Sequence, residues 1–212
     1  ENINVIYNGK PLQPGKRYYW KVRIRDNAGR VSEYSDSAWW EMGLLDQQNW
    51  QANWIGAGRT APETTAEFYD VHPAPLLRKE FNAENQVVRG RLYISGLGYY
   101  EAYLNGQRIG DQVLDPAWTD YEDRVFYSVY DVTEEIRNGR NAMGIMLGNG
   151  WYNPLPLRLF GRFNLREYLH HGQPMTISRL VIEYADGQQQ VIVSDDSWHW
   201  SEGPILKNNV YL

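Results

Sequence analysis

Two loops rich in aromatic residues hold the side chains best suited to bind a sugar. The two runs are DPAWTDY (residues 115–121) and GNGWYNP (148–154). Aromatic rings can stack on the C–H face of a sugar, and amides and carboxylates can pair with its hydroxyls. The loops therefore predict a carbohydrate-binding surface formed by Asp115, Trp118, Tyr121, Asn149, Trp151, Tyr152 and Asn153. In the alternative interpretation, the two Trp side chains plug the open end of a sandwich or dock a neighbouring domain.

The first of these loops is also acidic. The eleven residues LDPAWTDYEDR (114–124) include four carboxylates. Oxygen ligands on a loop suit a hard cation, so one hypothesis is a calcium site at Asp115, Asp120 and Asp123. A glycosidase pair would need one buried acid with a raised pKa, and four acids so close together are typical of a solvated segment. The ordinary alternative is a capped, water-exposed turn, and no catalytic residue is predicted here.

Other catalytic chemistry lacks the residues that it needs. The chain has no Cys, which excludes disulfides, thiolate metal sites and a cysteine nucleophile. Its four His have no Ser or carboxylate partner at a recognisable spacing, and His170 and His171 are adjacent, so on a strand they would face opposite sides. The run Gly96–Gly98 is followed by strand-like residues rather than a helix, which favours a tight bend over a phosphate-binding loop.

Composition bounds the class of protein. Of 212 residues, 42% are hydrophobic and 22% charged, which rules out wholesale disorder. The 26 acidic residues outnumber the 21 basic ones, so a basic nucleic-acid-binding surface is not expected. Apolar runs are far shorter than the roughly 20 residues of a membrane span. The absence of cysteine is compatible with both the cytoplasm and the periplasm. We favour a periplasmic or extracellular location over a cytoplasmic one.

The elements that must position the loops are strands. Tyr18, Trp20, Val22 and Ile24 alternate with basic residues, a period typical of a strand. Similar runs lie at 76–81, 91–94, 99–104, 125–130, 142–147, 180–184 and 190–193. Turn residues separate them, including Asn105-Gly106, the favoured pair for a two-residue hairpin. Helical signal is limited to short turns at 133–136 and 165–171 and to a segment that Asp46 could cap. We therefore expect an all-β fold, a jelly-roll-like β-sandwich.

The chain divides into two regions. In residues 1–43, the spacing of Leu12, Pro14, Gly15 and Tyr18 resembles the signature around the tyrosine corner of fibronectin type III modules. Only the C-terminal strands of such a partial fibronectin-like β-sandwich are present, and a sandwich cannot close on three strands. We therefore expect residues 1–43 to be a truncated domain, residues 44–212 to be the jelly-roll-like sandwich, and the chain to be a fragment of a longer protein.

Several ordered motifs in the second region resemble one family. WQANWIG (50–56) and APLLRKEF (74–81) are followed by the ordered series SGLGYYEAYLNG, DPAWTDY and LGNGWYN, which begins at Ser95 and ends at Asn153. This series is similar to the N-terminal β-domain of bacterial α-L-rhamnosidases of the glycoside hydrolase family 78 type. In that family the general acid and base lie in a separate (α/α)6 barrel, whose acidic motif is missing here. The resemblance therefore gives this chain no catalytic residue.

The resemblance implies a non-catalytic accessory domain of an enzyme that hydrolyses terminal α-L-rhamnose. One expectation is a carbohydrate-binding role, with a rhamnose-containing glycan as the partner. The alternative is a structural scaffold that packs on the missing catalytic domain of the same chain. Rhamnose-binding jelly rolls associated with these enzymes use calcium, which keeps the acidic loop of interest. We do not expect this chain to be active alone.

Overall fold

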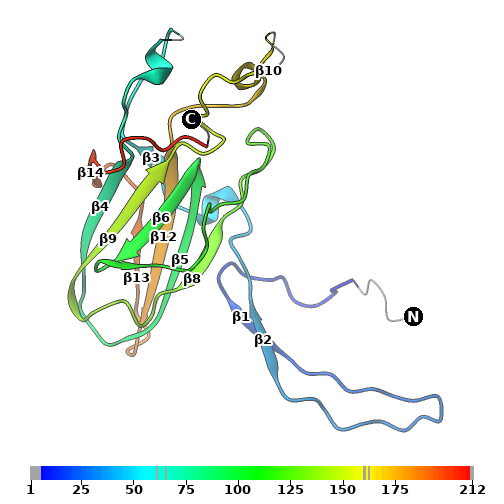
Figure 1. The fold of residues 1–212 in the computed structure, drawn as a ribbon. Coiled ribbons are helices and arrows are strands. Elements are labelled where there is room, and N and C mark those ends of the chain that lie inside the picture. Colours follow the sequence, from blue (N-terminus) through cyan, green and yellow to red (C-terminus); the bar gives the residue numbers. More distant parts are fainter. Residues whose placement is uncertain (1–5, 61, 65, 160, 162, 211–212) are drawn as a thin grey trace. The chain divides into compact units, whose positions relative to one another are not determined.

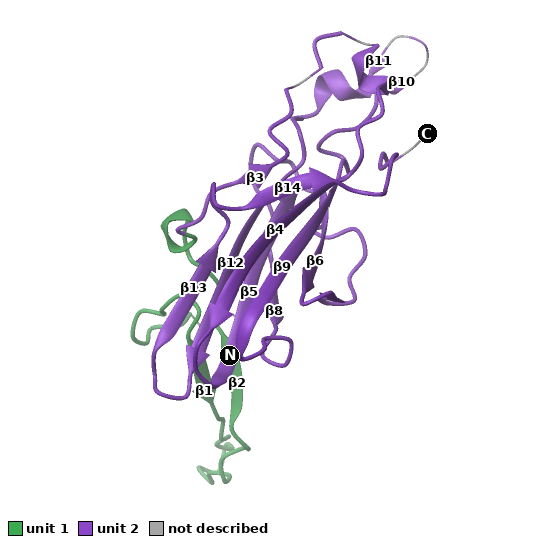
Figure 2. Ribbon diagram, turned by 90° about the vertical axis from the view of Figure 1, so that its left-hand side faces the viewer, with its two compact units in different colours: residues 1–50 green, residues 51–212 purple. Residues whose placement is uncertain are grey.

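The computed structural model describes residues 6–60, 62–64, 66–159, 161 and 163–210, and its regular structure is almost entirely β (Figure 1). This confirms the all-β prediction. The helices of the described residues are three single-turn 3-10 segments, none of them long and apolar enough to cross a membrane. The chain forms two compact units, residues 1–50 and 51–212 (Figure 2). The predicted domain boundary between residues 43 and 44 stays a prediction.

The first unit contains an antiparallel hairpin of β1 (Arg17–Trp20) and β2 (Ala38–Glu41). Tyr18 lies opposite Trp40, and their rings stack with centroids 5.0 Å apart. The Tyr18 hydroxyl accepts a hydrogen bond from the N–H of Gln13 at 2.6 Å, which fastens the preceding segment to the strand.

The unit ends in a capped turn that the sequence predicted. Asp46 caps the 3-10 segment η1 (Gln47–Asn49), because its carboxylate accepts the Asn49 N–H while the Asn49 side chain reaches back to the Asp46 N–H. This reciprocal capping box satisfies two backbone donors that the turn itself cannot.

The second unit is a β-sandwich of two five-stranded antiparallel sheets. The first sheet has the order β13-β12-β5-β8, with β3 also paired to β12. Its strands are β3 (Ile55–Gly56), β5 (Val87–Leu97), β8 (Ser128–Asp131), β12 (Met175–Tyr184) and β13 (Gln189–Val193). The second sheet has the order β14-β4-β9-β6-β7. Its strands are β4 (Pro75–Ala83), β6 (Tyr99–Leu104), β7 (Gln107–Arg108), β9 (Gly139–Gly148) and β14 (His199–Glu202).

The core lies between these sheets because alternate residues of each strand point inward. On β9, Met143, Ile145 and Leu147 are buried, whereas Gly144 and Met146 between them face outward. Leu92 and Ile94 of β5 and Leu180 and Ile182 of β12 belong to the same core cluster. Both sheets therefore contribute to one apolar interior, and their ends are held in fixed positions.

Two glycine-containing turns lie where the sequence predicted them, one within the second sheet and one between a strand of the first sheet and a strand of the second. Asn105 and Gly106 have φ values of 54° and 83° in the two-residue connection between β6 and β7. Gly98, with φ of 95°, forms the bend between β5 and β6. A Cβ atom there would lie 2.4 Å from the carbonyl oxygen of Gly148, so the close approach requires glycine. This contact holds the loop after β9 against the bend.

Candidate functional site

The loops at one end of the sandwich form the candidate site. Tyr99, which begins β6, pairs with Gly148, which ends β9, and Met175 at the start of β12 pairs with Leu97. The start of β4 pairs with Glu202, the end of β14. Segments before β4, after β9, before β12 and after β14 are therefore brought together at this end. The short elements η2 (Glu67–Tyr69), β10 (Arg158–Leu159), β11 (Phe163–Asn164) and η3 (Leu165–Tyr168) lie in these connections.

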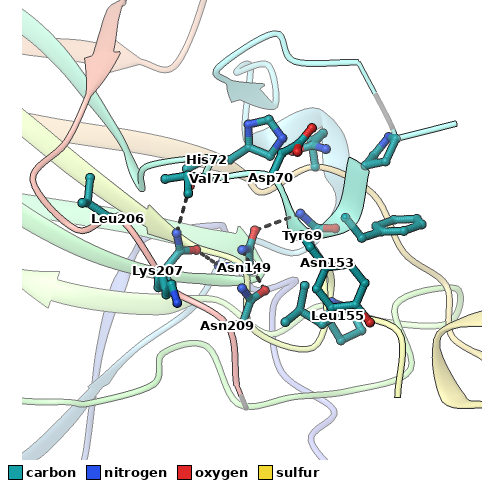
Figure 3. Close-up of a pocket in the computed structure, with 15 residues that line it drawn as sticks. Tyr69, Asp70, Val71, His72, Asn149, Asn153, Leu155, Leu206, Lys207 and Asn209 are labelled. Atoms are coloured by element: carbon teal, nitrogen blue, oxygen red, sulfur yellow. Dashed lines mark hydrogen bonds between the residues drawn. The ribbon is translucent and has the colours of Figure 1, made fainter. Parts of the chain in front are cut away.

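These segments surround a pocket of about 280 Å³, which we call the amide pocket. Its walls come from three stretches of chain far apart in the sequence and from one further residue (Figure 3). The lining residues are Pro62, Phe68, Tyr69, Asp70, Val71, His72, Asn149, Asn153, Pro154, Leu155, Gln173, Leu206, Lys207, Asn208 and Asn209. Five of them carry a side-chain amide, the group that can donate and accept hydrogen bonds at once.

Four asparagines of the amide pocket are joined to one another. The Asn149 backbone N–H donates to the Asn208 Oδ1 at 2.8 Å, and its Nδ2 donates to the Asn209 Oδ1 at 3.1 Å. The Asn153 Nδ2 donates to the Asn149 Oδ1 at 2.9 Å. Figure 3 shows these hydrogen bonds running through the group of asparagines. All four residues are half-buried and line the pocket.

A buried arginine donates hydrogen bonds to this network. Arg166 of η3 is only 4% exposed. Its Nη1 donates to the Asn153 Oδ1 at 2.9 Å and to the Pro154 carbonyl oxygen at 2.6 Å. The guanidinium also lies 4.2 Å from the centre of the Phe68 ring. One side chain therefore connects an amide of the pocket to an aromatic residue of its wall.

His171 adds a titratable group beside this arginine. Its Nδ1 lies 3.5 Å from the Arg166 Nη2. Partial burial lowers the pKa of His171, and the positive charge of Arg166 lowers it further. Both effects favour the neutral imidazole, which can accept a hydrogen bond from the guanidinium.

The seven residues predicted to bind carbohydrate do not form one surface. Asn149 and Asn153 line the amide pocket. Trp118 and Trp151 stack on each other, with ring centroids 5.1 Å apart and an interplanar angle of 24°. Trp118 remains 50% exposed. The two ring faces in this stack are not available to a sugar, so a sugar could stack only on the outer face of either ring. The pair also links its two loops.

The two tyrosines predicted to bind carbohydrate also contact each other, but edge to face. The rings of Tyr121 and Tyr152 are 5.1 Å apart at 80°, and Tyr152 is only 8% exposed. Burial raises the pKa of Tyr121 to about 12, and the backbone of Gly98 partly offsets this effect. Tyr152 therefore packs between loops, and the carbohydrate-binding role of these aromatic residues stays a prediction.

Asp115 lies away from the amide pocket. Its Oδ2 accepts hydrogen bonds from the Ser128 hydroxyl at 2.7 Å, the Tyr130 hydroxyl at 2.9 Å and the Tyr100 hydroxyl. Burial and the hydrogen bond to this carboxylate raise the pKa of Tyr100. Asp115 thus ties its loop to β6 and β8.

The structure does not bring together the three carboxylates predicted to bind calcium. Asp120 and Asp123 are exposed, and the Asp123 N–H donates to the Asp120 carbonyl oxygen at 3.1 Å in a local turn. Within the described ranges no group of three or more His, Asp or Glu side chains is arranged to hold a metal ion. This segment therefore has the geometry of a hydrogen-bonded turn, and the calcium hypothesis gains no support from it.

Several residues of the amide pocket were not predicted from the sequence. Asn208, Asn209 and Gln173 lie in irregular segments, and Phe68 lies in η2, within a stretch whose sequence has little periodicity. Asn208 and Asn209 are adjacent, but asparagine is common in turns and loops, so the pair is no specific signal for a binding site. Nothing in the sequence connected it with Asn149.

Comparisons with known proteins match both units. Residues 85–212 match the family model described as the α-L-rhamnosidase N-terminal domain. Residues 1–46 match a model described as a Rha78A-like N-terminal immunoglobulin domain. The narrower assignment of this region to fibronectin type III modules stays a prediction.

Whole-chain relatives and solved structures agree with these models. An α-L-rhamnosidase of Formosa agariphila is 38% identical over 98% of this chain and 23% of its own length. The structure of an α-L-rhamnosidase from Dictyoglumus thermophilum is 41% identical, with a TM-score of 0.80 over 97% of this chain and 22% of that one. An Aspergillus terreus enzyme is 33% identical, with a TM-score of 0.79 over 96% of this chain and 23% of that one.

The chain therefore spans about a fifth of the length of the relatives it matches. By the family model that covers more than half of its residues, the chain belongs to the α-L-rhamnosidase N-terminal domain family.

Proposed function

We propose that this chain is the non-catalytic N-terminal portion of a longer α-L-rhamnosidase, and that the amide pocket binds the sugar part of a rhamnose-containing glycan. The observation that carries the proposal is the set of four interlinked asparagines in a pocket at the loop end of the sandwich. Homology to larger rhamnosidases supports the first part.

The chemistry of the pocket suits a small neutral polyol. Its volume of about 280 Å³ is close to the lower end of ordinary small-molecule sites, about 300 Å³. Amides pair with adjacent hydroxyls because each offers two donors and an acceptor. Because hydrogen bonds already order these amides, less side-chain entropy is lost when a ligand binds.

The same pocket does not suit bond hydrolysis. Glycosidases flank the scissile bond with two carboxylates. Among the described lining residues Asp70 is the one carboxylate, and it is exposed rather than buried. This supports a binding role without catalysis and agrees with a catalytic centre elsewhere in the parent protein.

A titration with L-rhamnose tests the proposal. The side-chain amide resonances of Asn149, Asn153 and Asn209 should shift at millimolar sugar in NMR spectra. Asn209→Ala should weaken the response several-fold, whereas Asn138→Ala, an exposed asparagine before β9, should leave it unchanged. If no pocket amide responds at millimolar sugar, the binding role is refuted.

A second candidate, the structural scaffold, is supported by a different surface. An apolar groove of about 560 Å³ lies along β14, β4, β9 and β6, with Leu76, Tyr103, Met146 and Trp200 among its lining residues. An apolar patch of this kind suits a protein interface. Under this alternative, Met146→Glu leaves the isolated chain folded but lowers the melting temperature of the full-length parent protein. Unchanged melting of the parent would count against it.

A further inference from the structure

Asparagine precedes glycine four times in the chain, at residues 8–9, 105–106, 138–139 and 149–150. Asparagine is a thermolabile residue, and a following glycine exposes it further because glycine has no side chain to obstruct its own backbone nitrogen. That nitrogen can attack the side-chain amide of the asparagine and close a succinimide ring. The asparagine side chain must turn to reach it, so the contacts of each pair decide which of them can react.

Hydrogen bonds fix the asparagine side chain in two of the pairs. The Asn105 Nδ2 donates to the Glu135 carbonyl oxygen and to the Asn141 Oδ1, both at 2.8 Å. The Asn105 Oδ1 accepts the Ala142 N–H at 3.0 Å. Both polar atoms of the Asn149 side chain are likewise bonded within the amide pocket. These side chains must break hydrogen bonds before they can turn, which raises the barrier to reaction.

The pair Asn8-Gly9 is exposed, but its glycine is covered. The Tyr7 ring occupies the place where a Cβ of residue 9 would stand. The Tyr7 hydroxyl donates to the Lys10 carbonyl oxygen at 2.9 Å, which holds the ring over Gly9. We expect this cover to slow the reaction at Asn8.

Asn138 has neither kind of restraint. It is exposed, and its side chain makes no hydrogen bond to any residue that the structure describes. Gly139 has a φ of 88°, and beyond its chain neighbours no heavy atom lies within 4 Å of the place of a Cβ. Gly139 and Ala83 form the last pair of the ladder between β9 and β4, where local opening requires least free energy. The Asn138 amide can therefore turn toward the Gly139 nitrogen.

We propose that Asn138 is a site of intramolecular deamidation. In the first step the Gly139 nitrogen loses its proton to hydroxide and bonds to the Asn138 Cγ. The Cγ–Nδ2 bond breaks, and ammonia leaves with a proton from water. Water then opens the succinimide ring at either carbonyl carbon, which leaves aspartate or isoaspartate at position 138. The net reaction consumes one water and releases one ammonia, with no change of oxidation state.

The isoaspartyl product disturbs the turn before β9. Asn141, which is 3% exposed, bonds the backbone on both sides of Asn138. Its Nδ2 donates to the carbonyl oxygens of Arg137 at 2.7 Å and Gly139 at 2.9 Å. Isoaspartate inserts one methylene into the backbone between these two carbonyls, so a single amide can no longer bond both. Loss of one such hydrogen bond should lower the melting temperature by about 2–4 °C.

The test follows deamidation of each pair by mass spectrometry. The chain is incubated at mildly alkaline pH, once folded and once in urea, and then digested with pepsin in acid, which stops the reaction. In the folded chain, the peptide with Asn138 should convert from amide to acid about tenfold faster than those with Asn105 and Asn149, because breaking a hydrogen bond changes a rate by about this factor. In urea, all four pairs should react at similar rates.

Two variants of the exposed position 138 serve as controls. Asn138→Gln should remove the fast reaction, because its longer side chain closes the ring much more slowly. Asn138→Asp adds the same negative charge as isoaspartate without the extra methylene, and should melt like the unmodified chain.

Four results would contradict the proposal or its structural basis. Equal rates at Asn138 and Asn105 in the folded chain overturn it, as does faster reaction at Asn8. If Asn105 stays slow in urea, the local sequence protects it, and the role given to its hydrogen bonds is overturned. An isoaspartyl form that melts like Asn138→Asp overturns the disturbance assigned to Asn141.

Discussion

Arg166 is the residue on which the arrangement of the amide pocket depends most directly. We predict that Arg166→Met destabilises the second unit and releases Asn153. Methionine retains apolar contact with Phe68 but removes the Nη1 donor to the Asn153 Oδ1 and to the Pro154 carbonyl oxygen. Both acceptors then need another partner in a site where the arginine itself is only 4% exposed.

The magnitude follows from these contacts. Hydrogen bonds from a charged donor contribute about 1.5–3 kcal/mol each, so two of them give about 3–6 kcal/mol. Removing a buried guanidinium also removes its desolvation cost, which offsets part of this loss. We expect a net decrease of about 2 kcal/mol in the free energy of unfolding. For a unit of this size that lowers the melting temperature by about 4–8 °C.

The assay combines thermal melting with NMR of the asparagine side chains. Arg166→Lys is the matched variant, because it keeps the charge but cannot reproduce the planar stacking on Phe68 and the paired geometry. We expect it to recover only part of the stability. If Arg166→Met melts within 1 °C of the unmodified chain and the Asn153 amide resonances keep their positions, the reasoning about this arginine is wrong.

Three further predictions concern the core, the acidic loop and pH. Ile145→Ala, at a core position 1% exposed, should cost about 2–5 kcal/mol in denaturant unfolding, whereas the outward-facing Met146→Ala should cost much less. Asp115→Ala should cost about 3 kcal/mol because three hydroxyls lose one acceptor, and calcium should not restore the loss. The pKa of His171 is lowered in the folded state, so its contribution to stability is present above about pH 6.5 and is lost as the pH falls below that value. The melting temperature should therefore be lower at pH 5.5 than at pH 7.5, and His171→Gln should make this difference smaller.

Local sequence signals were enough to predict several of the strands and turns. The run from Tyr99 to Leu104 was predicted with the bounds that β6 has, because alternation and the pair Asn105-Gly106 are local signals. The cap at Asp46 was predicted for the same reason. In these segments the residues that decide the conformation are neighbours along the chain.

Which side chains share a site depends on how segments far apart in the sequence pack together. Asn149 and Asn209 are sixty residues apart and meet because β9 and β14 end at the same end of the sandwich. The two aromatic loops were grouped in the sequence by their residue types, but residue type cannot say whether a ring faces a ligand or another ring. Trp118 and Trp151 stack on each other although thirty-three residues separate them, so their contact depends on the packing of two separate loops.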